Sequence, residues 1–193
     1  MYAIHTTPGL VIDSRPYGEA GKRLSIFTRD FGLVLATAQG IRLQRSKLRY
    51  HAQDYSFGEF SLVRGRESWR LVNAGGSSLA LPRRADRELI ARVASLLRRL
   101  LPGEEANPEL FGRLEACAAF LAGGPLADGE KLKTLESITV FGILRALGYI
   151  GEDKALARYA GPLDLTPELV DLAVPKRGAM NRHINKALKE SHL

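Results

Sequence analysis

The first eighty residues place apolar and polar positions in short alternating runs, the pattern of β-strands that bury one face. Leu24 and Ile26 share one face of the run 23–28. A second apolar run follows at 33–38. Between these runs, Asp30-Phe31-Gly32 is typical of a hairpin turn, because glycine adopts positive φ without strain. We therefore expect two strands joined by a tight turn.

Three further strands are expected, at 9–12, 55–63 and 69–72, with a turn at 64–67 between the last two. Tyr55 and Phe57 have one parity, whereas Phe60 and Leu62 have the other. A bulge at Gly58 would bring all four side chains to one face. Five short strands with glycine-marked turns predict a small barrel, and the OB-fold is the leading candidate.

The period changes to that of helices after the stretch 75–78. Apolar residues recur at helical spacing over 89–100, where Pro102-Gly103 ends the run. Asn107-Pro108 starts a second helix, 128–147 forms a longer and more buried one, and shorter helices are expected from Thr166 and over 181–188. The prediction is an N-terminal OB-fold barrel at 1–80 followed by an all-α domain at 81–193.

Charge separates the two halves further. The chain has 28 basic and 21 acidic residues and a formal net charge of +7. Up to Ala80 there are eleven basic and six acidic residues, an excess of five, whereas the remainder has seventeen and fifteen, an excess of two. A basic excess favours a polyanionic partner. The binding site for a polyanion is therefore expected mainly in the first half.

The loop from Gly40 to Tyr50 is the most informative local feature, because its cations can follow phosphates on a segment free to adapt. More cations and two tyrosines that could stack bases belong to the neighbouring strands and turns, although each could equally be a solvated surface group. The candidate DNA contacts are Tyr17, Lys22, Arg23, Arg29, Arg42, Arg45, Lys47, Arg49, Tyr50, Arg64, Arg66 and Arg70. For Tyr55 and Trp69, core filling is the expected role.

Signals of catalysis or metal binding are weak. The segment 18–22 lacks the first glycine and the Ser or Thr of a phosphate-binding loop. Cys117 is the single cysteine, which excludes an intramolecular disulfide and a thiolate-cluster zinc site, and it lies on an apolar helical stripe. The histidines have no metal-binding spacing. We expect no enzyme activity, cofactor or metal. We also expect no secretion signal and no membrane span. The expected location is the cytoplasm, in association with the nucleoid.

Five segments, in order, resemble the bacterial DNA repair protein RecO family. They are Arg15-Pro16-Tyr17-Gly18-Glu19-Ala20 with the strand 24–32, the glycine-then-basic loop 38–49, the strand and turn 60–66, Asn107-Pro108-Glu109-Leu110-Phe111, and Leu144-Arg145-Ala146-Leu147-Gly148-Tyr149. The similarity covers Gly9 to Tyr149. Some family members carry a four-cysteine zinc site after the last segment, which this sequence lacks. The C-terminal helical part, which ends at Leu193, is expected to be abridged.

The resemblance implies a non-enzymatic protein of recombinational repair that binds single- and double-stranded DNA. It implies that the protein engages the acidic C-terminal tail of single-strand-binding protein, acts with RecR to load RecA, and anneals strands. The tail needs an apolar pocket with a basic rim. The candidate rim residues are Arg92, Arg98, Arg99, Lys131 and Lys133.

Two alternatives remain open from the sequence. The barrel could serve as a protein-interaction adaptor that binds no DNA, or the chain could be an RNA-binding OB-fold protein. Under the adaptor alternative, charge reversal at Arg45 and Lys47 would leave function intact.

Overall fold

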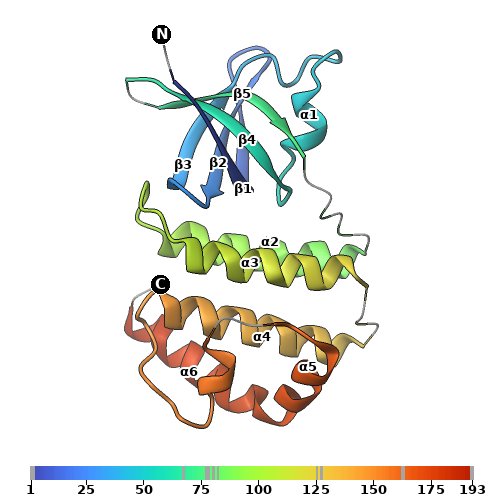
Figure 1. Cartoon of the computed structure of the whole chain (residues 1–193), viewed down its shortest axis with the longest axis vertical. Helices are drawn as coiled ribbons and strands as arrows, with labels where there is room; N and C mark the ends of the chain where they lie inside the picture. Colours follow the sequence, from blue (N-terminus) through green and yellow to red (C-terminus); the bar gives the residue numbers. More distant parts are fainter. Residues whose placement is uncertain are drawn as a thin grey trace. The chain divides into compact units, whose positions relative to one another are not determined.

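A computed structural model of the chain describes residues 3–66, 68–76, 79, 81, 83–124, 126, 128–161 and 164–191 (Figure 1). The strands are β1 (Ile4–Tyr17), β2 (Gly21–Thr28), β3 (Gly32–Ala38), β4 (Phe57–Arg64) and β5 (Trp69–Gly75), with the short helix α1 (Leu48–His51) between β3 and β4. The longer helices are α2 (Arg84–Leu100), α3 (Pro108–Ala122), α4 (Gly129–Ala146), α5 (Pro167–Ala173) and α6 (Arg177–Glu190). Two 3₁₀ turns, Ala157–Tyr159 and Val174–Lys176, precede α5 and α6.

The five strands form a closed barrel in the order β1-β2-β3-β5-β4. All neighbours are antiparallel except β3 and β5, which pair in parallel at Ala36–Trp69 and Thr37–Arg70. The barrel core contains Leu24, Ile26 and Trp69, of which Trp69 is 2% exposed. The expectation of a five-stranded OB-fold barrel followed by helices is confirmed, and so is the core role of Trp69.

The hairpin between β2 and β3 forms where the sequence predicts it. Gly32 has φ +67°. The Thr28 hydroxyl donates to the Gly32 carbonyl at 2.9 Å and accepts from the Phe31 amide at 3.1 Å. Glycine is required here for a second reason, since a Cβ at this position would lie 2.3 Å from the Glu105 carbonyl oxygen.

Two details of the strand prediction are wrong. β1 spans Ile4–Tyr17 and extends beyond both ends of the strand expected at 9–12. Its last residues, Arg15 to Tyr17, are exposed, so the sequence there shows no alternation of apolar and polar positions. Gly58 is not a bulge, because β4 pairs with β1 without a break from Phe57 to Val63. Gly58 lies opposite Gly9, and the absent Gly9 side chain makes room for the Phe60 ring.

Tyr55 precedes β4 and has φ +66°, so it is not one of the strand residues that Gly58 was expected to align. The register irregularity of β4 lies instead against β5, between Ser61 and Leu62. Phe60 and Leu62 enter the barrel core, whereas Phe57 is buried outside that cluster, opposite Leu10.

The helices begin and end at the expected signals. The Asn107 side chain accepts from the Leu110 amide at 2.9 Å, and Thr166 accepts from the Leu169 amide at 3.2 Å. Asp128 caps α4, which buries nine of its residues and ends before Gly148, a glycine with φ +80°. α4 is therefore the buried helix that the sequence predicts. α6 is longer than expected, because it begins at Arg177.

The chain divides into two compact units. The first comprises Met1–Ala80 and Ile90–Phe111, and the second comprises Leu81–Leu89 and Gly112–Leu193. Within the first unit, the segment before α3 is tied to the barrel: the Leu33 amide donates to the Gly103 carbonyl at 2.9 Å, and Arg64 pairs with Glu104 at 2.5 Å. The division into domains at residues 80 and 81 stays a prediction.

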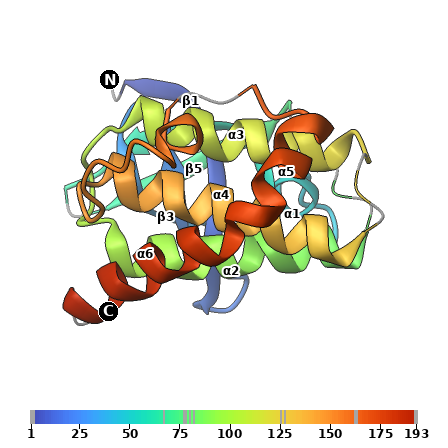
Figure 2. The ribbon, with the colours of Figure 1, turned by 90° about the horizontal axis from the view of Figure 1, so that it is seen from below.

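In the second unit, α6 lies against α4, with α5 beside the start of α4 (Figure 2). The buried face of α6 consists of Met180, Ile184 and Ala187. On the opposite side of α6, the charged residues Arg182, Lys186, Lys189 and Glu190 are exposed.

Candidate nucleic-acid interface

Strand pairing places three arginines in one row on the outside of the barrel. Arg15 in β1 pairs with Arg23 in β2, and Arg23 pairs with Thr37 in β3. Thr37 pairs in turn with Arg70 in β5. Paired residues on neighbouring strands face the same side, and neighbouring strands lie about 4.8 Å apart, so the row spans about 14 Å. We call Arg15, Arg23, Thr37 and Arg70 the arginine row.

The arginine row points away from the barrel core. Arg15, Arg23 and Arg70 are exposed, whereas their strand neighbours Leu24 and Trp69 are buried. The Thr37 hydroxyl donates to the Trp69 carbonyl at 3.3 Å and so ties β3 to β5 at the centre of the row. A line of exposed cations on a rigid sheet is suited to the phosphates of a nucleic-acid backbone.

Apolar and aromatic side chains accompany the row. Leu35 and Val72 each lie two residues from a member of the row on the same strand, and they are 44% and 39% exposed. Tyr17, at the end of β1, is 50% exposed, and the Arg23 guanidinium carbon lies 4.7 Å from the centre of its ring. Such surfaces can pack against bases while the cations hold phosphates.

The basic loop between β3 and α1, which was expected to be free to adapt, is anchored at its start. Ile41 is 2% exposed and belongs to the barrel core together with Ala52. The Arg42 amide donates to the Ala20 carbonyl at 2.9 Å, and its guanidinium donates to the Glu19 carbonyl at 3.4 Å. The loop is thereby held beside the turn that follows Tyr17.

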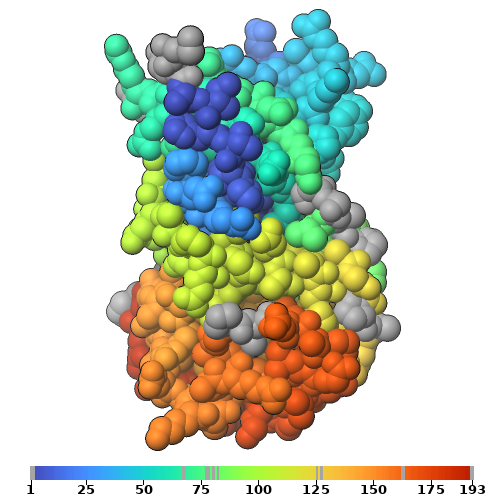
Figure 3. Space-filling view, in the orientation of Figure 1, coloured from blue at the N-terminus to red at the C-terminus, as the bar shows by residue number. Residues whose placement is uncertain are grey.

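The other cations of this loop stand on its surface, which is the cyan corner of the barrel in Figure 3. Arg45 and Lys47 are exposed. Arg49 is half-buried and donates to the hydroxyl of the exposed Tyr50 at 2.7 Å, with its guanidinium carbon 4.7 Å from that ring. Arg49 and Tyr50 in α1 therefore hold each other in place through a hydrogen bond and a cation–π contact.

Four of the expected DNA contacts lie elsewhere on the first unit. Lys22 neighbours Arg23 on the strand and points to the opposite face, where its ammonium donates to Ser14 Oγ at 3.1 Å. Arg29 lies over the Phe111 ring at 5.3 Å, beyond the far end of β2. Arg64 pairs with Glu104, and Arg66 is exposed in the turn after β4. Of the expected contacts, strand pairing thus places only Arg23 and Arg70 in the arginine row, with Tyr17 against Arg23.

Arg15, Thr37 and Leu35 were not among the contacts expected from the sequence. Arg15 lies outside the strand expected at 9–12, and Thr37 and Leu35 carry no charge. Their place is set by the register of β1, β2 and β3, which local sequence does not reveal. The carboxylate of Asp13 is also close, since it accepts from Arg15 Nε at 3.3 Å and lies 3.5 Å from an Arg98 nitrogen.

The five residues expected around a partner-tail pocket divide between the units. Arg92, Arg98 and Arg99 belong to the first unit, and Lys131 and Lys133 to the second. Lys131 pairs with Asp171 at 2.5 Å, and this hydrogen bond raises the pKa of the lysine. Lys133 lines a groove.

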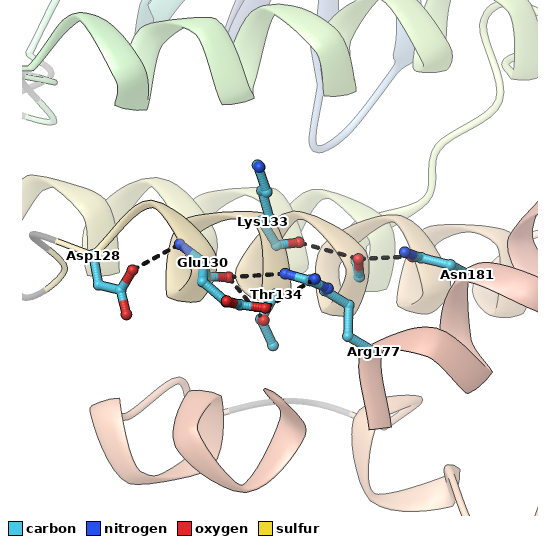
Figure 4. Close-up of polar contacts among 7 residues, drawn as sticks. Asp128, Glu130, Lys133, Thr134, Arg177 and Asn181 are labelled. Carbon is cyan, nitrogen blue, oxygen red and sulfur yellow. Dashed lines mark hydrogen bonds and ion pairs between the residues drawn. The ribbon is translucent and has the colours of Figure 1, made fainter. Parts of the chain in front are cut away.

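That groove, of about 410 Å³, lies between α4 and α6. Val140 and Ile184 supply apolar surface, Lys133 and Arg177 supply positive charge, and Glu136 supplies negative charge. Figure 4 shows how the two helices are joined: Arg177 pairs with the Glu130 carboxylate at 3.0 Å, and the Ser137 hydroxyl hydrogen bonds with Asn181 at 2.8 Å. The groove is thus built on fixed side chains.

Over the described residues, His, Cys, Asp and Glu form no group of three or more that could hold a metal ion. Over the same part of the chain, none of the helices has the length and apolar character needed to cross a membrane.

Residues 1–75 match the family described as "Recombination protein O N terminal". The barrel belongs to the RecO N-terminal family. The RecO barrel is an OB-fold domain, in agreement with the closed five-stranded sheet.

Curated relatives extend the similarity beyond the RecO barrel. The DNA repair protein RecO of Rubrobacter xylanophilus is 33% identical over 151 residues, which cover 66% of this chain and 61% of the relative. The RecO of Desulfitobacterium hafniense is 34% identical over 113 residues, covering 56% and 41%, and that of Pelotomaculum thermopropionicum is 30% identical over 144 residues, covering 73% and 55%. The chain thus matches about half the length of these relatives.

Proposed function

We propose that this chain is a non-enzymatic DNA-binding protein of recombinational repair, which binds single- and double-stranded DNA across the outside of its RecO barrel. The observation that carries the proposal is the arginine row on a domain of this family. Binding requires no bond chemistry, because cations displace condensed counterions from phosphates in a sequence-independent way.

The row supplies contacts on the sheet, and the basic loop supplies further ones. Arg42 is hydrogen bonded to Ala20 in the turn between β1 and β2, so the basic loop lies next to the end of β1 where Tyr17 contacts Arg23. The sheet face of strands 2 and 3 and the adjoining loops are the usual ligand surface of OB-folds. The proposed path of the DNA therefore runs across β2, β3 and β5 and onto the loop that carries Arg45 and Lys47.

We further propose that the chain acts with RecR to load RecA or anneal strands, and that it engages the acidic tail of single-strand-binding protein. The groove between α4 and α6 supports the last point, since it combines apolar surface with the positive charge of Lys133. An acidic peptide with an apolar end requires that combination.

The test of DNA binding is a fluorescence anisotropy titration of a labelled single-stranded oligonucleotide at several salt concentrations. Wild-type affinity should fall log-linearly with salt, with a slope of about 0.7 per neutralised phosphate. The variant Arg23→Glu with Arg70→Glu should bind at least about tenfold more weakly and lose about 1.4 from the slope. The matched control is Lys154→Glu with Arg158→Glu, which makes the same charge change at two exposed cations of the second unit.

Equal affinity of the row variant and its control would exclude the row as the binding surface. No binding by wild-type protein at low salt would favour the adaptor alternative, and tighter binding of RNA of equal length would favour the RNA-binding one. Arg45→Glu with Lys47→Glu tests the loop separately, and unchanged affinity in that variant would remove the loop from the proposed path.

A further inference from the structure

The small basic excess of the second half is concentrated in one helix. From Lys176 to Glu190 the chain has five basic residues and one acidic residue. Residues 81–175 have twelve basic and fourteen acidic residues. The rest of this half is thus slightly acidic, and α6 with its preceding residue accounts for more than the whole excess.

Three of these cations form a stripe along α6. Arg182, Lys186 and Lys189 follow one another at spacings of four and three residues, which places them on one side of a helix. All three are exposed. With a rise of 1.5 Å per residue, the stripe extends about 10 Å along the helix axis.

Three other cations of the second unit, unlike Arg182 and Lys189, form close ion pairs with acidic side chains. Lys131 pairs with Asp171, Arg145 with Glu152, and Arg177 with Glu130. Within the described part of the chain, Arg182 and Lys189 form no ion pair, and Lys186 forms one, an exposed i,i+4 pair with Glu190 at 3.8 Å. Most of the positive charge of the stripe is therefore available to an external anion.

The side of α6 between the stripe and the groove carries amides. Asn181 and Asn185 line the groove and are themselves exposed. Amide groups donate to phosphate oxygens, as arginine and lysine do. A polyanion along α6 would therefore meet cations on one side and hydrogen-bond donors on the other.

We propose that the α6 stripe is a second binding site for nucleic acid, which holds the phosphate backbone of a second single strand while the barrel holds the first. This inference rests on the proposed function for its first site. Its physical basis is that the stripe lies on the second unit and the arginine row on the first, so one strand need not occupy both. Two strands neutralised on one protein repel each other less, which favours their pairing.

The experiment uses the full chain and two short non-complementary single strands, one with a donor dye and one with an acceptor dye. Energy transfer together with sedimentation mass reports complexes of one chain with two strands. The variant Arg182→Glu with Lys186→Glu should keep its affinity for the first strand within about twofold. Its affinity for the second strand should fall at least about tenfold, and the salt slope of that step by about 1.4.

The control Lys154→Glu with Arg158→Glu should behave as wild type in both steps. Arg182→Gln with Lys186→Gln repeats the test without charge reversal, and the thermal midpoint verifies that each variant is folded. Undiminished second-strand binding in the stripe variant, or energy transfer arising only from complexes with two chains, would overturn the proposal.

The Arg23→Glu, Arg70→Glu variant separates this proposal from the proposed function. If only the stripe proposal fails, this variant loses first-strand binding while the stripe variant retains every step. If only the barrel assignment fails, the Arg23→Glu, Arg70→Glu variant binds both strands as wild type does. The stripe variant still loses second-strand binding. Loss of binding to an acidic peptide in the stripe variant, with both DNA steps intact, would identify α6 as a protein site and contradict the proposal.

Discussion

The guanidinium carbon of Arg23 lies 4.7 Å from the centre of the Tyr17 ring. Arg23 belongs to the arginine row, and the ring of Tyr17 remains half exposed at the end of β1. The pair therefore places an exposed cation against an exposed aromatic ring, the two groups that the proposed DNA contact at the end of β1 requires.

Tyr17→Ala should weaken single-stranded DNA binding by about 5- to 150-fold, since base stacking on an aromatic ring contributes about 1–3 kcal/mol. Tyr17→Phe keeps the ring and should bind within about twofold of wild type, because the stacking surface is retained. Anisotropy titration at fixed salt measures both. Equal binding by the alanine and phenylalanine variants would show that the ring does not stack on a base.

Ile41→Ala should destabilise the first unit by about 2–4 kcal/mol, because it leaves a cavity where the loop is anchored in the barrel core. It should also speed amide exchange over residues 40–47, since the loop loses its anchor. Leu43→Ala is the control in the same loop, at a side chain that is 42% exposed, and should change neither quantity measurably. Chemical denaturation and hydrogen exchange give the two readouts; identical protection in both variants would contradict anchoring by Ile41.

Gly32→Ala should be more destabilising than Gly18→Ala. Both glycines have positive φ, which costs a residue with a Cβ about 1–2 kcal/mol. At Gly32 the new Cβ would also lie within 2.6 Å of Glu105 backbone atoms, whereas nothing lies within 4 Å of it at Gly18. Denaturant midpoints measure the difference, and equal midpoints would mean that the segment at Glu105 does not pack on this turn.

The pH dependence of stability should include a contribution from Cys117. Burial raises the pKa of this thiol to about 11 from 9.0, even though a hydrogen bond with Thr139 opposes the shift. Between about pH 9 and 11 the unfolded chain loses the proton while the folded chain keeps it. Stability is therefore full below pH 9 and falls by roughly 2–3 kcal/mol as pH rises through this window.

Cys117→Ala removes this titration, so the difference in unfolding free energy between wild type and variant should shrink from pH 9 to pH 11. Denaturation curves at several pH values measure it. In the folded protein, thiol reagents should also react slowly with Cys117, because the reactive thiolate is suppressed. A difference independent of pH would contradict the raised pKa.

Much of the fold followed from local signals. Asp30-Phe31-Gly32 marked the hairpin correctly because its turn is stabilised within a few residues, by Thr28 and the positive φ of Gly32. Asn107 and Thr166 marked helix starts for the same reason, since each caps an amide three residues ahead. The length of β1 was not predictable, because its second half is exposed and its extended form is fixed by pairing with β2.

The proposed DNA surface was only partly accessible from the sequence. Charge density located it in the first half, and Tyr17, Arg23 and Arg70 were among the residues expected. Lys22, next to Arg23, was also an expected contact, but side chains alternate along a strand, so Lys22 points to the opposite face.

By itself the sequence determined the types of the elements, the barrel's basic character and the turns and caps, because these depend on residues within a few positions of one another. The tertiary structure alone decided that Arg15, Arg23 and Arg70 form one row, since Thr37 and Arg70 meet through a parallel pairing of strands distant in the chain. It also decided that Ile41 anchors the basic loop, because burial depends on what the rest of the barrel places around a side chain.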